Sequence, residues 1–559
     1  MVPQFKNFAF CCVCFFLVGC EQPQPADLIL VNASIYTVDD QNPWAEALAI
    51  RAGDIVGVGT NADVLAKFEG PQRDLDGKMV LPGFHDSHSH LIYGGLQMSQ
   101  CDLSGLGSPA AILAAIEVCD QSLDPSDWLV GGGWDLSLFV DANPSKTLLD
   151  QVNPDRRTFL RAADGHSAWV SSAALRYAGI ESETPDPADG IIERDSGSQP
   201  SGVVRESAML LVENVLPAID ATVRESAARQ AIALAHQNGI TSVIDAAATT
   251  ADAETYEALA ASDVLNMRVV LAMSVIAPFF DPAPVESIEP EHRQTQKLVR
   301  RQSAKIFVDG VLEGETAALI APYFSDKGGH GMLITPAEEL QSKVIRLDAM
   351  GVQLMFHAIG DFGVRVALDA IEAAQTSNGD QDLRHHISHL QLIDPVDRPR
   401  FKALNVAANV QALWALPDSY IMDVNLPAVG PDRVQAMYPI GSLDAVETAI
   451  VGGSDWPVSS MNPLLAIETA LTRQDPTGVI AGVLNEQETV SLATMIAAYT
   501  KNGAHLMHQE QLTGQLQVGK RADLVVLSDN LFTLAPHEIS EVSVVATYFE
   551  GRQVFPYES

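Results

Sequence analysis

His88 and His90 lie two residues apart in segment 82–90 of the chain. In a β-strand, residues i and i+2 share a face, so both imidazoles can bind one ion. The spacing alone is weak evidence, because structural and surface histidines often show it too. Three more residues of ligand type close later apolar runs: His357, His389 and Asp455. Together they predict a metal site.

Four imidazoles and one carboxylate suit Zn²⁺ or another borderline divalent ion. Each histidine alone is better explained as a hydrogen-bonded core or rim residue. Four of them at the ends of predicted strands are harder to explain in that way, because strand ends are where barrel folds gather functional groups. We therefore expect one or two divalent ions as cofactors, with zinc the best match to the ligand types.

Eight apolar, β-like runs carry these residues and alternate with helical patterns such as 222–237, 337–349, 361–375 and 432–437. The runs are 79–88, 241–246, 267–274, 304–309, 352–357, 386–390, 406–411 and 449–455. Eight strands with intervening helices favour an α/β fold of the (β/α)₈ TIM-like type over an open sheet. In such a barrel the carboxyl ends of all strands meet at one mouth.

The gap between the first and second runs is far too long for one crossover connection. We therefore expect an insertion at about 97–220, after the first barrel strand, with strands of its own at 128–131 and 157–161. Short alternating strands also occur near both ends of the chain. They predict a small β-sandwich built from residues 27–78 and 506–559, with the barrel spanning 79–505.

The N-terminus resembles an exported lipoprotein. Residues 1–19 hold Lys6 and then an uncharged apolar run that suits a signal peptide. The run ends at Cys20 in a sequence similar to the bacterial lipobox, and residues 20–26 suit a polar tether. We expect lipidation at Cys20 and a membrane-anchored, periplasm-facing protein. The alternative is a plain cleaved signal peptide with an accidental cysteine.

The composition of the chain limits the kinds of binding partner that we expect. The 559 residues carry 34 Lys+Arg against 71 Asp+Glu, a net charge of −37, so a nucleic-acid partner is not expected. Beyond the N-terminus no apolar stretch is long enough to span a membrane, which leaves the lipid anchor as the expected membrane contact. Cys101 and Cys119 stay open between a disulfide and two buried thiols. Assembly into a homo-oligomer is also open.

Several segments in this order resemble the amidohydrolase superfamily, and its YtcJ-like branch (amidohydrolase family 3) in particular. The resemblance runs from about Asp27 to Phe555. It rests on segment 82–90, Gly131-Gly132-Gly133-Trp134-Asp135, Asp164-Gly165-His166-Ser167-Ala168-Trp169, Gly202-Val203-Val204-Arg205-Glu206, Lys305-Ile306-Phe307-Val308-Asp309-Gly310, His357-Ala358-Ile359-Gly360-Asp361, Gly453-Ser454-Asp455-Trp456-Pro457 and segment 514–527.

The resemblance implies a ligand set. His88, His90 and Asp455 would hold the more buried metal, and His357 and His389 the second. Lys305 falls where the superfamily often has a carboxylated lysine that bridges two ions; a carbamate offers two anionic oxygens where an ammonium would repel cations. The alternative is an unmodified lysine that pairs with Asp309 or Glu313.

The resemblance also implies the chemistry, which is hydrolysis of carbon–nitrogen bonds other than peptide bonds in a small amide or N-acyl or N-formyl compound. Asp455 would carry a proton from water to the leaving nitrogen, or act only as a ligand. His166 would stabilise an oxyanion, or be structural. Trp134 and Trp169 are candidate substrate-pocket residues, as is Trp414, although tryptophans are more often core.

Three alternatives remain from the sequence, one of which is a catalytically inactive barrel that serves assembly. An ester or lactone hydrolase would use the same site on a similar carbonyl. A non-enzymatic solute-binding lipoprotein would explain the anchor and the acidity, but it would leave the ligand-like histidines without a role.

Overall fold

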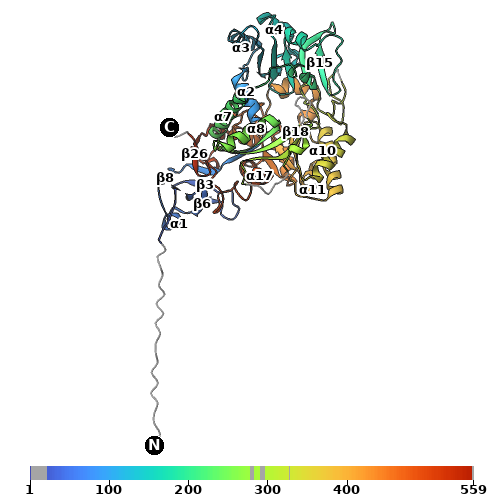
Figure 1. Ribbon diagram of the computed structural model, residues 1–559. Coiled ribbons are helices and arrows are strands. Elements are labelled where there is room, and N and C mark those ends of the chain that lie inside the picture. The colour runs from blue at the N-terminus through green and yellow to red at the C-terminus, as the bar shows by residue number, and fades with distance from the viewer. Residues whose placement is uncertain (2–21, 277–282, 290–295, 326–327, 557–559) are drawn as a thin grey trace.

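Eight parallel strands form a barrel at the centre of the molecule (Figure 1). The structure is a computed structural model that describes residues 1, 22–276, 283–289, 296–325 and 328–556. The barrel strands, in spatial order, are β10 (Phe84–Ser89), β17 (Ile240–Ala248), β18 (Arg268–Ile276), β19 (Val299–Phe307), β20 (Gln353–Ala358), β21 (His386–His389), β22 (Ala407–Val410) and β23 (Ile450–Gly452). The predicted (β/α)₈ fold is confirmed.

Contacts between the first and last strands close the barrel. Ser89 forms a parallel bridge with Trp456, and the Asp455 amide donates to the His88 carbonyl at 2.7 Å. These contacts lie immediately beside predicted metal ligands. Closure of the barrel therefore brings residues that are more than 360 positions apart in the sequence into one mouth.

Helices cover the outside of the barrel, and their sequences explain where they form. α10 (Asp361–Asn378) buries Val364, Leu368 and Ile371, which share one helical face. α8 (Thr250–Ala261) begins with a capping box between Thr249 and Asp252. The remaining outer helices include α2 (Leu91–Ser99), α7 (Ala221–Gln237), α9 (Ala337–Ala349), α11 (Arg398–Ala403) and α15 (Pro463–Thr472). Within the described ranges, no helix has the length and hydropathy that crossing a membrane requires.

The first predicted run is two strands and not one. β9 (Met79–Pro82) pairs with strands of the terminal β-domain, whereas the barrel begins with β10 at Phe84. Gly83 stands at the break, where an added Cβ would lie 2.3 Å from Thr241 Oγ1. The predicted start of the barrel at residue 79 is therefore wrong, because an uninterrupted apolar run does not reveal a change of sheet.

Both ends of the chain build a β-sandwich of two sheets. One sheet has the order β6 (Asp54–Gly59), β5 (Ala47–Arg51), β2 (Leu28–Val31) and β8 (Gln72–Asp74). The other has the order β26 (Arg552–Phe555), β25 (Val544–Phe549), β24 (Leu524–Leu527), β9, β3 (Ser34–Tyr36) and β4 (Trp44–Ala45). Leu30, Leu48, Val80 and Leu524 belong to the core that the two sheets share.

The expected tether is shorter than predicted. β1 (Gln24–Pro25) pairs with β7 (Phe68–Glu69), and the Ala26 amide donates to the Glu69 carbonyl at 2.8 Å. The last residues of the predicted tether are therefore bound to the β-domain through backbone hydrogen bonds, which residue composition does not predict. Cys20 and residues 2–19 of the predicted signal peptide lie outside the described residues.

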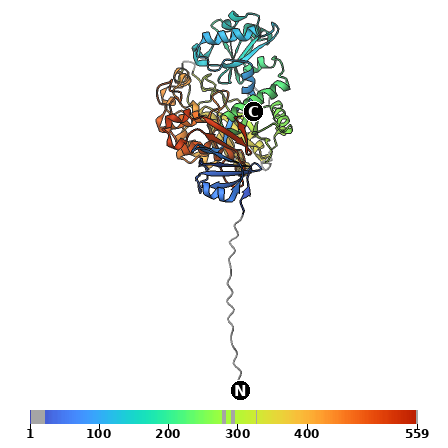
Figure 2. The same ribbon diagram turned by 90° about the vertical axis from the view of Figure 1, so that its left-hand side faces the viewer.

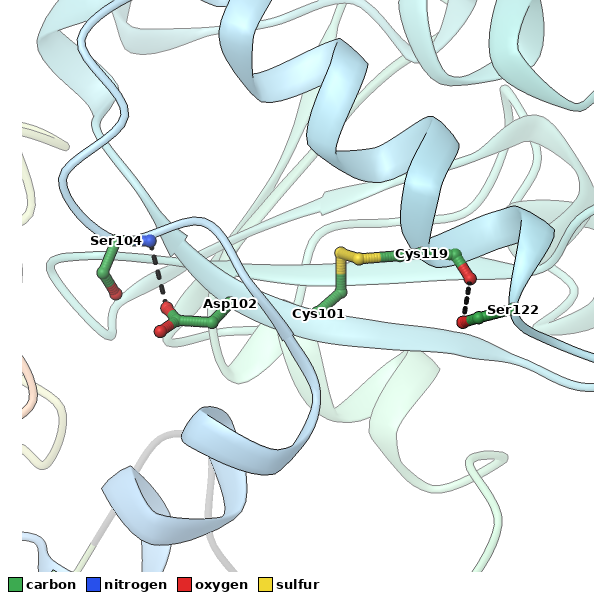
Figure 3. The surroundings of a disulfide bond; sticks show 5 residues. All are labelled: Cys101, Asp102, Ser104, Cys119 and Ser122. Carbon is green, nitrogen blue, oxygen red and sulfur yellow. Dashed lines mark hydrogen bonds between the residues drawn. A yellow bond between two sulfur atoms is a disulfide. The ribbon is translucent and has the colours of Figure 1, made fainter.

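The insertion forms a six-stranded sheet at the end of the molecule opposite the β-sandwich (Figures 1 and 2). Its order is β11 (Cys101–Asp102), β12 (Leu129–Trp134), β13 (Thr158–Ala162), β14 (Ser167–Val170), β16 (Pro200–Glu206) and β15 (Gly190–Arg194). Cys101 and Cys119 are joined by a disulfide that ties β11 to α3 (Pro109–Gln121) (Figure 3). Of the two alternatives left open for these cysteines, the structure has the disulfide.

Candidate active site

His88, His90 and Asp455 meet at the barrel mouth. Asp455 Oδ1 lies 3.2 Å from His88 Nε2 and 3.0 Å from His90 Nε2. His88 is within β10 and His90 directly follows it, while Asp455 follows β23. Their ligand atoms are close enough to share one ion. Two strands that adjoin at the barrel closure thus supply a compact three-ligand group.

His357 and His389 lie beside this group at the ends of β20 and β21. Their ring centroids are 4.6 Å apart, and the His389 ring is 4.8 Å from that of His88. His389 Nδ1 is 3.9 Å from Asp455 Oδ2. All five ligands predicted from the histidine and aspartate pattern therefore lie at one mouth.

Lys305 lies on β19 at the same centre. Its Nζ is 3.0 Å from His88 Nε2, and the residue is 1% exposed. Burial lowers its pKa to about 7, so a large fraction of the amine is neutral at neutral pH. Asp309 accepts backbone N–H groups, as from Gly360, and Glu313 accepts from Asn425; among the described residues neither pairs with Lys305. The alternative of an ion-paired structural lysine does not describe this arrangement.

The donor set fits a borderline divalent ion. Nδ1 of His357 and Nδ1 of His389 are buried without a hydrogen-bond partner among the described residues. Burial lowers the pKa of His88 and His357 well below the ordinary value and that of His389 to about 3, so these rings are neutral and keep a lone pair for a metal. Burial opposes ionisation of Asp455, but its hydrogen bond with His90 and its electrostatic interactions with His389, His90 and Lys305 lower its pKa overall.

Asp86 accepts hydrogen bonds from both backbone segments that carry these ligands. Its Oδ1 accepts the amides of His88 at 3.1 Å and Ser454 at 2.9 Å, and its Oδ2 accepts the Ser454 hydroxyl at 2.6 Å. The side chain is 1% exposed. Asp86 therefore links the strand of His88 to the residue before Asp455. In the sequence, Asp86 lies among the histidines of segment 82–90, but this position alone does not reveal its role in holding the two backbones.

His166 comes from the insertion and lies over the metal ligands. Its ring centroid is 4.9 Å from that of His357, and its Nδ1 is 2.9 Å from Glu206 Oε2. Glu206 Oε1 accepts the Thr316 hydroxyl at 2.9 Å, which joins the insertion to the barrel. Burial disfavours a protonated His166, but the Glu206 carboxylate outweighs burial and raises the His166 pKa. The arrangement suits an N–H donor at the mouth. Sequence reasoning assigned Glu206 only to a family motif.

A cavity of about 420 Å³ opens directly over these residues, between the barrel mouth and the insertion. Its walls include His166, His357, His389 and Asp455, together with apolar and aromatic side chains such as Leu106, Leu413, Trp414, Tyr420 and Tyr438. Trp414 is stacked on His389 with parallel rings 5.5 Å apart. Such a cavity has the size and mixed lining of a small-molecule site.

Trp134 and Trp169 do not line this cavity, so their prediction as pocket residues is wrong. Both are fully buried in the core of the insertion, where their rings pack 5.9 Å apart. Trp134 Nε1 donates to the Leu160 carbonyl at 2.8 Å. Strand alternation turns these two side chains away from the mouth, and the sequence motif does not reveal which face of the strand meets the cavity.

Fold and site together define a metal-dependent amidohydrolase, a barrel hydrolase that acts on carbon–nitrogen bonds. A family model described as "Amidohydrolase family" matches residues 73–555, and the chain belongs to that family. The predicted membership of the amidohydrolase superfamily and its YtcJ-like branch is confirmed.

Three curated relatives align over nearly the whole chain. Protein LONG AFTER FAR-RED 3 of Arabidopsis thaliana is 32% identical, covering 95% of this chain and 92% of its own. Putative amidohydrolase YtcJ of Bacillus subtilis (strain 168) is 29% identical, covering 93% and 98%. N-substituted formamide deformylase of Arthrobacter pascens is 27% identical, covering 96% and 99%.

A solved structure shares the fold. An uncharacterized metal-dependent hydrolase from Pyrococcus furiosus superposes with a TM-score of 0.67 at 24% identity, covering 90% of this chain and 99% of its own. The likeness spans nearly all of both chains, so the two proteins share the overall fold.

Proposed function

We propose that this protein hydrolyses the carbon–nitrogen bond of a small N-acyl or N-formyl amine, using one or two divalent ions held by His88, His90, His357, His389 and Asp455. The observation that carries the proposal is the group of imidazoles around an ionised Asp455, of which those of His88, His357 and His389 are buried and neutral, directly below a substrate-sized cavity. The nitrogen and oxygen donors favour zinc. The similarity to an N-substituted formamide deformylase supports the substrate class.

A bound divalent ion would polarise the substrate carbonyl and lower the pKa of a water towards 7. Asp455 would take up a proton from the attacking water and deliver it to the leaving nitrogen. His166, oriented by Glu206 at 2.9 Å, would donate its other ring N–H to the oxygen that gains charge. The neutral Lys305 amine would add CO₂ and release one proton, and the resulting carbamate would provide two anionic oxygens when two ions are bound.

The first test is the metal-to-protein ratio, by plasma mass spectrometry, on protein expressed from Glu21 onward. About two ions per chain would support a carboxylated Lys305, and about one would leave Lys305 unmodified. No metal after incubation with Zn²⁺ or Mn²⁺ would overturn the proposal and favour a solute-binding protein.

Asp455→Asn provides the second test, on N-alkylformamides followed by release of the free amine. We expect turnover to fall below detection while the thermal unfolding midpoint stays close to that of the wild type. Unchanged turnover would refute the proton-carrying role of Asp455. Hydrolysis of matched alkyl esters but of no amide would replace the amide assignment with an esterase.

We also propose that the mature protein is lipidated at Cys20 and faces the periplasm. The Cys101–Cys119 disulfide supports this proposal, because disulfides persist in oxidising compartments. Intact-mass analysis of protein extracted from membranes would show the mass of a lipidated Cys20 terminus. A Cys20→Ser variant should lose that mass and leave the membrane fraction; equal membrane retention of both forms would refute the anchor.

A further inference from the structure

Besides the metal ligands, the cavity lining is rich in hydrogen-bond acceptors. Asp135, Asp164, Glu313 and Asp418 all line the cavity, and among the described residues no lysine or arginine does. Asp135 comes from the insertion, Glu313 follows β19 and Asp418 follows β22. The carboxylates therefore approach one space from three different parts of the fold.

Two of these carboxylates have few partners. Glu313 Oε1 accepts from Asn425 Nδ2 at 2.9 Å, and Asp418 Oδ1 accepts the Ile421 amide at 2.9 Å. Within the described ranges neither forms an ion pair with a lysine or arginine. Burial, together with the nearby charges of Glu313 and Asp135, raises the Asp418 pKa to about 7. Such a group of half-buried carboxylates, close enough to raise one another's pKa, is costly unless a positive charge joins it.

Gln391 provides an independent sign of a ligand. Its side chain lines the cavity and is 4% exposed, and its Nε2 is committed to the Tyr438 hydroxyl at 2.5 Å. Its Oε1 has no hydrogen-bond partner among the described residues. A buried acceptor without a donor is the exception in folded proteins, so this oxygen calls for a donor from outside the chain.

The neighbouring cationic side chains do not supply the positive charge that these carboxylates lack. His166 is paired with Glu206. Arg161 borders a smaller adjoining cavity and is paired with Glu213. Lys305 faces His88.

A metal ion does not fit this wall as well as an organic cation does. Among the described residues, the group close enough to share an ion is His88, His90 and Asp455, and it contains none of these carboxylates. Carboxylates set wider apart suit a cation that is spread over several atoms or donates in several directions. Trp414, Tyr420 and Tyr438 add aromatic surface, which also attracts cations.

We propose that the substrate carries a protonated amine at the end away from the scissile bond, and that Glu313, Asp418 and Gln391 Oε1 bind this ammonium group. The inference rests on the proposed hydrolase function, since the metal ligands and these acceptors line one cavity. The chain would thus select N-acylated amines with a second, cationic nitrogen joined through an apolar spacer.

Binding tests the proposal independently of turnover. Pentylamine, 1-pentanol and pentanoate are titrated into the metal-loaded protein by calorimetry. We expect pentylamine to bind at least roughly tenfold more tightly than pentanol, equivalent to about 1.4 kcal/mol, and pentanoate not to bind. Glu313→Gln and Asp418→Asn should each remove most of that preference. Glu315→Gln is the matched control, because Glu315 lies two residues on and does not line the cavity.

Retention of tight pentylamine binding in both variants would overturn the proposal, because the amine would then be bound elsewhere, for example at the metal. Equal binding of pentylamine and pentanol to the wild type would overturn it as well. Two variants keep the test valid if one fails to fold, and the thermal unfolding midpoint reports folding.

Kinetics separates this proposal from the hydrolase function. Mono-N-formyl derivatives of 1,4-diaminobutane, 1,5-diaminopentane and 1,6-diaminohexane are compared with N-formylalkylamines of equal length. Preference for the diamines that Glu313→Gln removes would support both proposals. Hydrolysis without preference would overturn the ammonium site and leave the hydrolase. Amine binding that depends on Glu313, with no hydrolysis of any formamide, would support the ammonium site and count against the formamide assignment.

Discussion

Removal of the Asp86 carboxylate should weaken metal binding although Asp86 is not itself a ligand. The carboxylate accepts three hydrogen bonds, two of them from the backbone amides of His88 and Ser454. Asp86→Ala leaves both buried amides without an acceptor, which costs about 1–3 kcal/mol for each. It also frees the two strand ends that hold His88 and Asp455. Loss of such an outer partner lowers metal affinity by roughly 10–100-fold.

Asp86→Asn is the matched variant. Oδ1 accepts both backbone amides in the structure, and an asparagine oxygen in the same place can do the same. Its Nδ2 then takes the place of Oδ2, which lies 2.6 Å from the Ser454 hydroxyl oxygen in the structure. In the variant this Nδ2 donates and the hydroxyl oxygen accepts. We therefore expect Asn at this position to stay within about threefold of the wild-type affinity, a difference below about 0.7 kcal/mol.

Competition for Zn²⁺ against a chromogenic chelator measures the affinity, and circular dichroism with thermal unfolding checks the fold. Two results would refute the reasoning. Wild-type affinity in Asp86→Ala would mean that the hydrogen bonds of Asp86 do not position the metal ligands. Equal damage in Asp86→Asn and Asp86→Ala would mean that the charge of the group matters and not its hydrogen-bond geometry.

Three further predictions follow from other parts of the structure. Replacement of Cys101 and Cys119 by serine should destabilise the insertion by about 2–4 kcal/mol in urea unfolding, measured against the wild type kept oxidised. Burial raises the Asp245 pKa to about 8, so the folded state holds a proton that the unfolded state releases near pH 4; stability should fall as pH rises between about 4 and 8, and Asp245→Asn should flatten that slope. Trp414→Leu should raise KM, because Trp414 lines the cavity, whereas Trp134→Leu should lower the unfolding midpoint and leave KM unchanged; the reverse pattern would contradict the cavity assignment.

The ligand group could be predicted because it depends on strand periodicity and strand order alone. His88, His357 and His389 each occupy a strand or strand end, where an apolar run in the sequence marks both the element and its end. α9 matches its predicted range of 337–349, because its apolar positions recur with helical spacing. Such patterns are local, so a single sequence contains them.

The substrate side of the site could not be predicted in the same way. Glu313, Gln391 and Asp418 lie in loops after β19, β21 and β22, and loop conformation has no periodic sequence signal. Trp134 and Trp169 share a sequence motif with functional neighbours, but the packing of a whole sheet decides that they face its core. These positions depend on how the insertion meets the barrel, which is a tertiary property.

The docking of the insertion is therefore part of the active site and not only of the fold. Thr316 of the barrel donates to Glu206, the carboxylate that orients His166, so one hydrogen bond both attaches the insertion and positions a catalytic candidate. A second contact, between the Ser137 and Ser419 hydroxyls at 2.9 Å, joins the segments that carry Asp135 and Asp418. The barrel strands alone fix the metal ligands, whereas the charge lining the cavity comes from loops and from the insertion. Substrate choice can therefore change through these segments while the metal ligands stay in place.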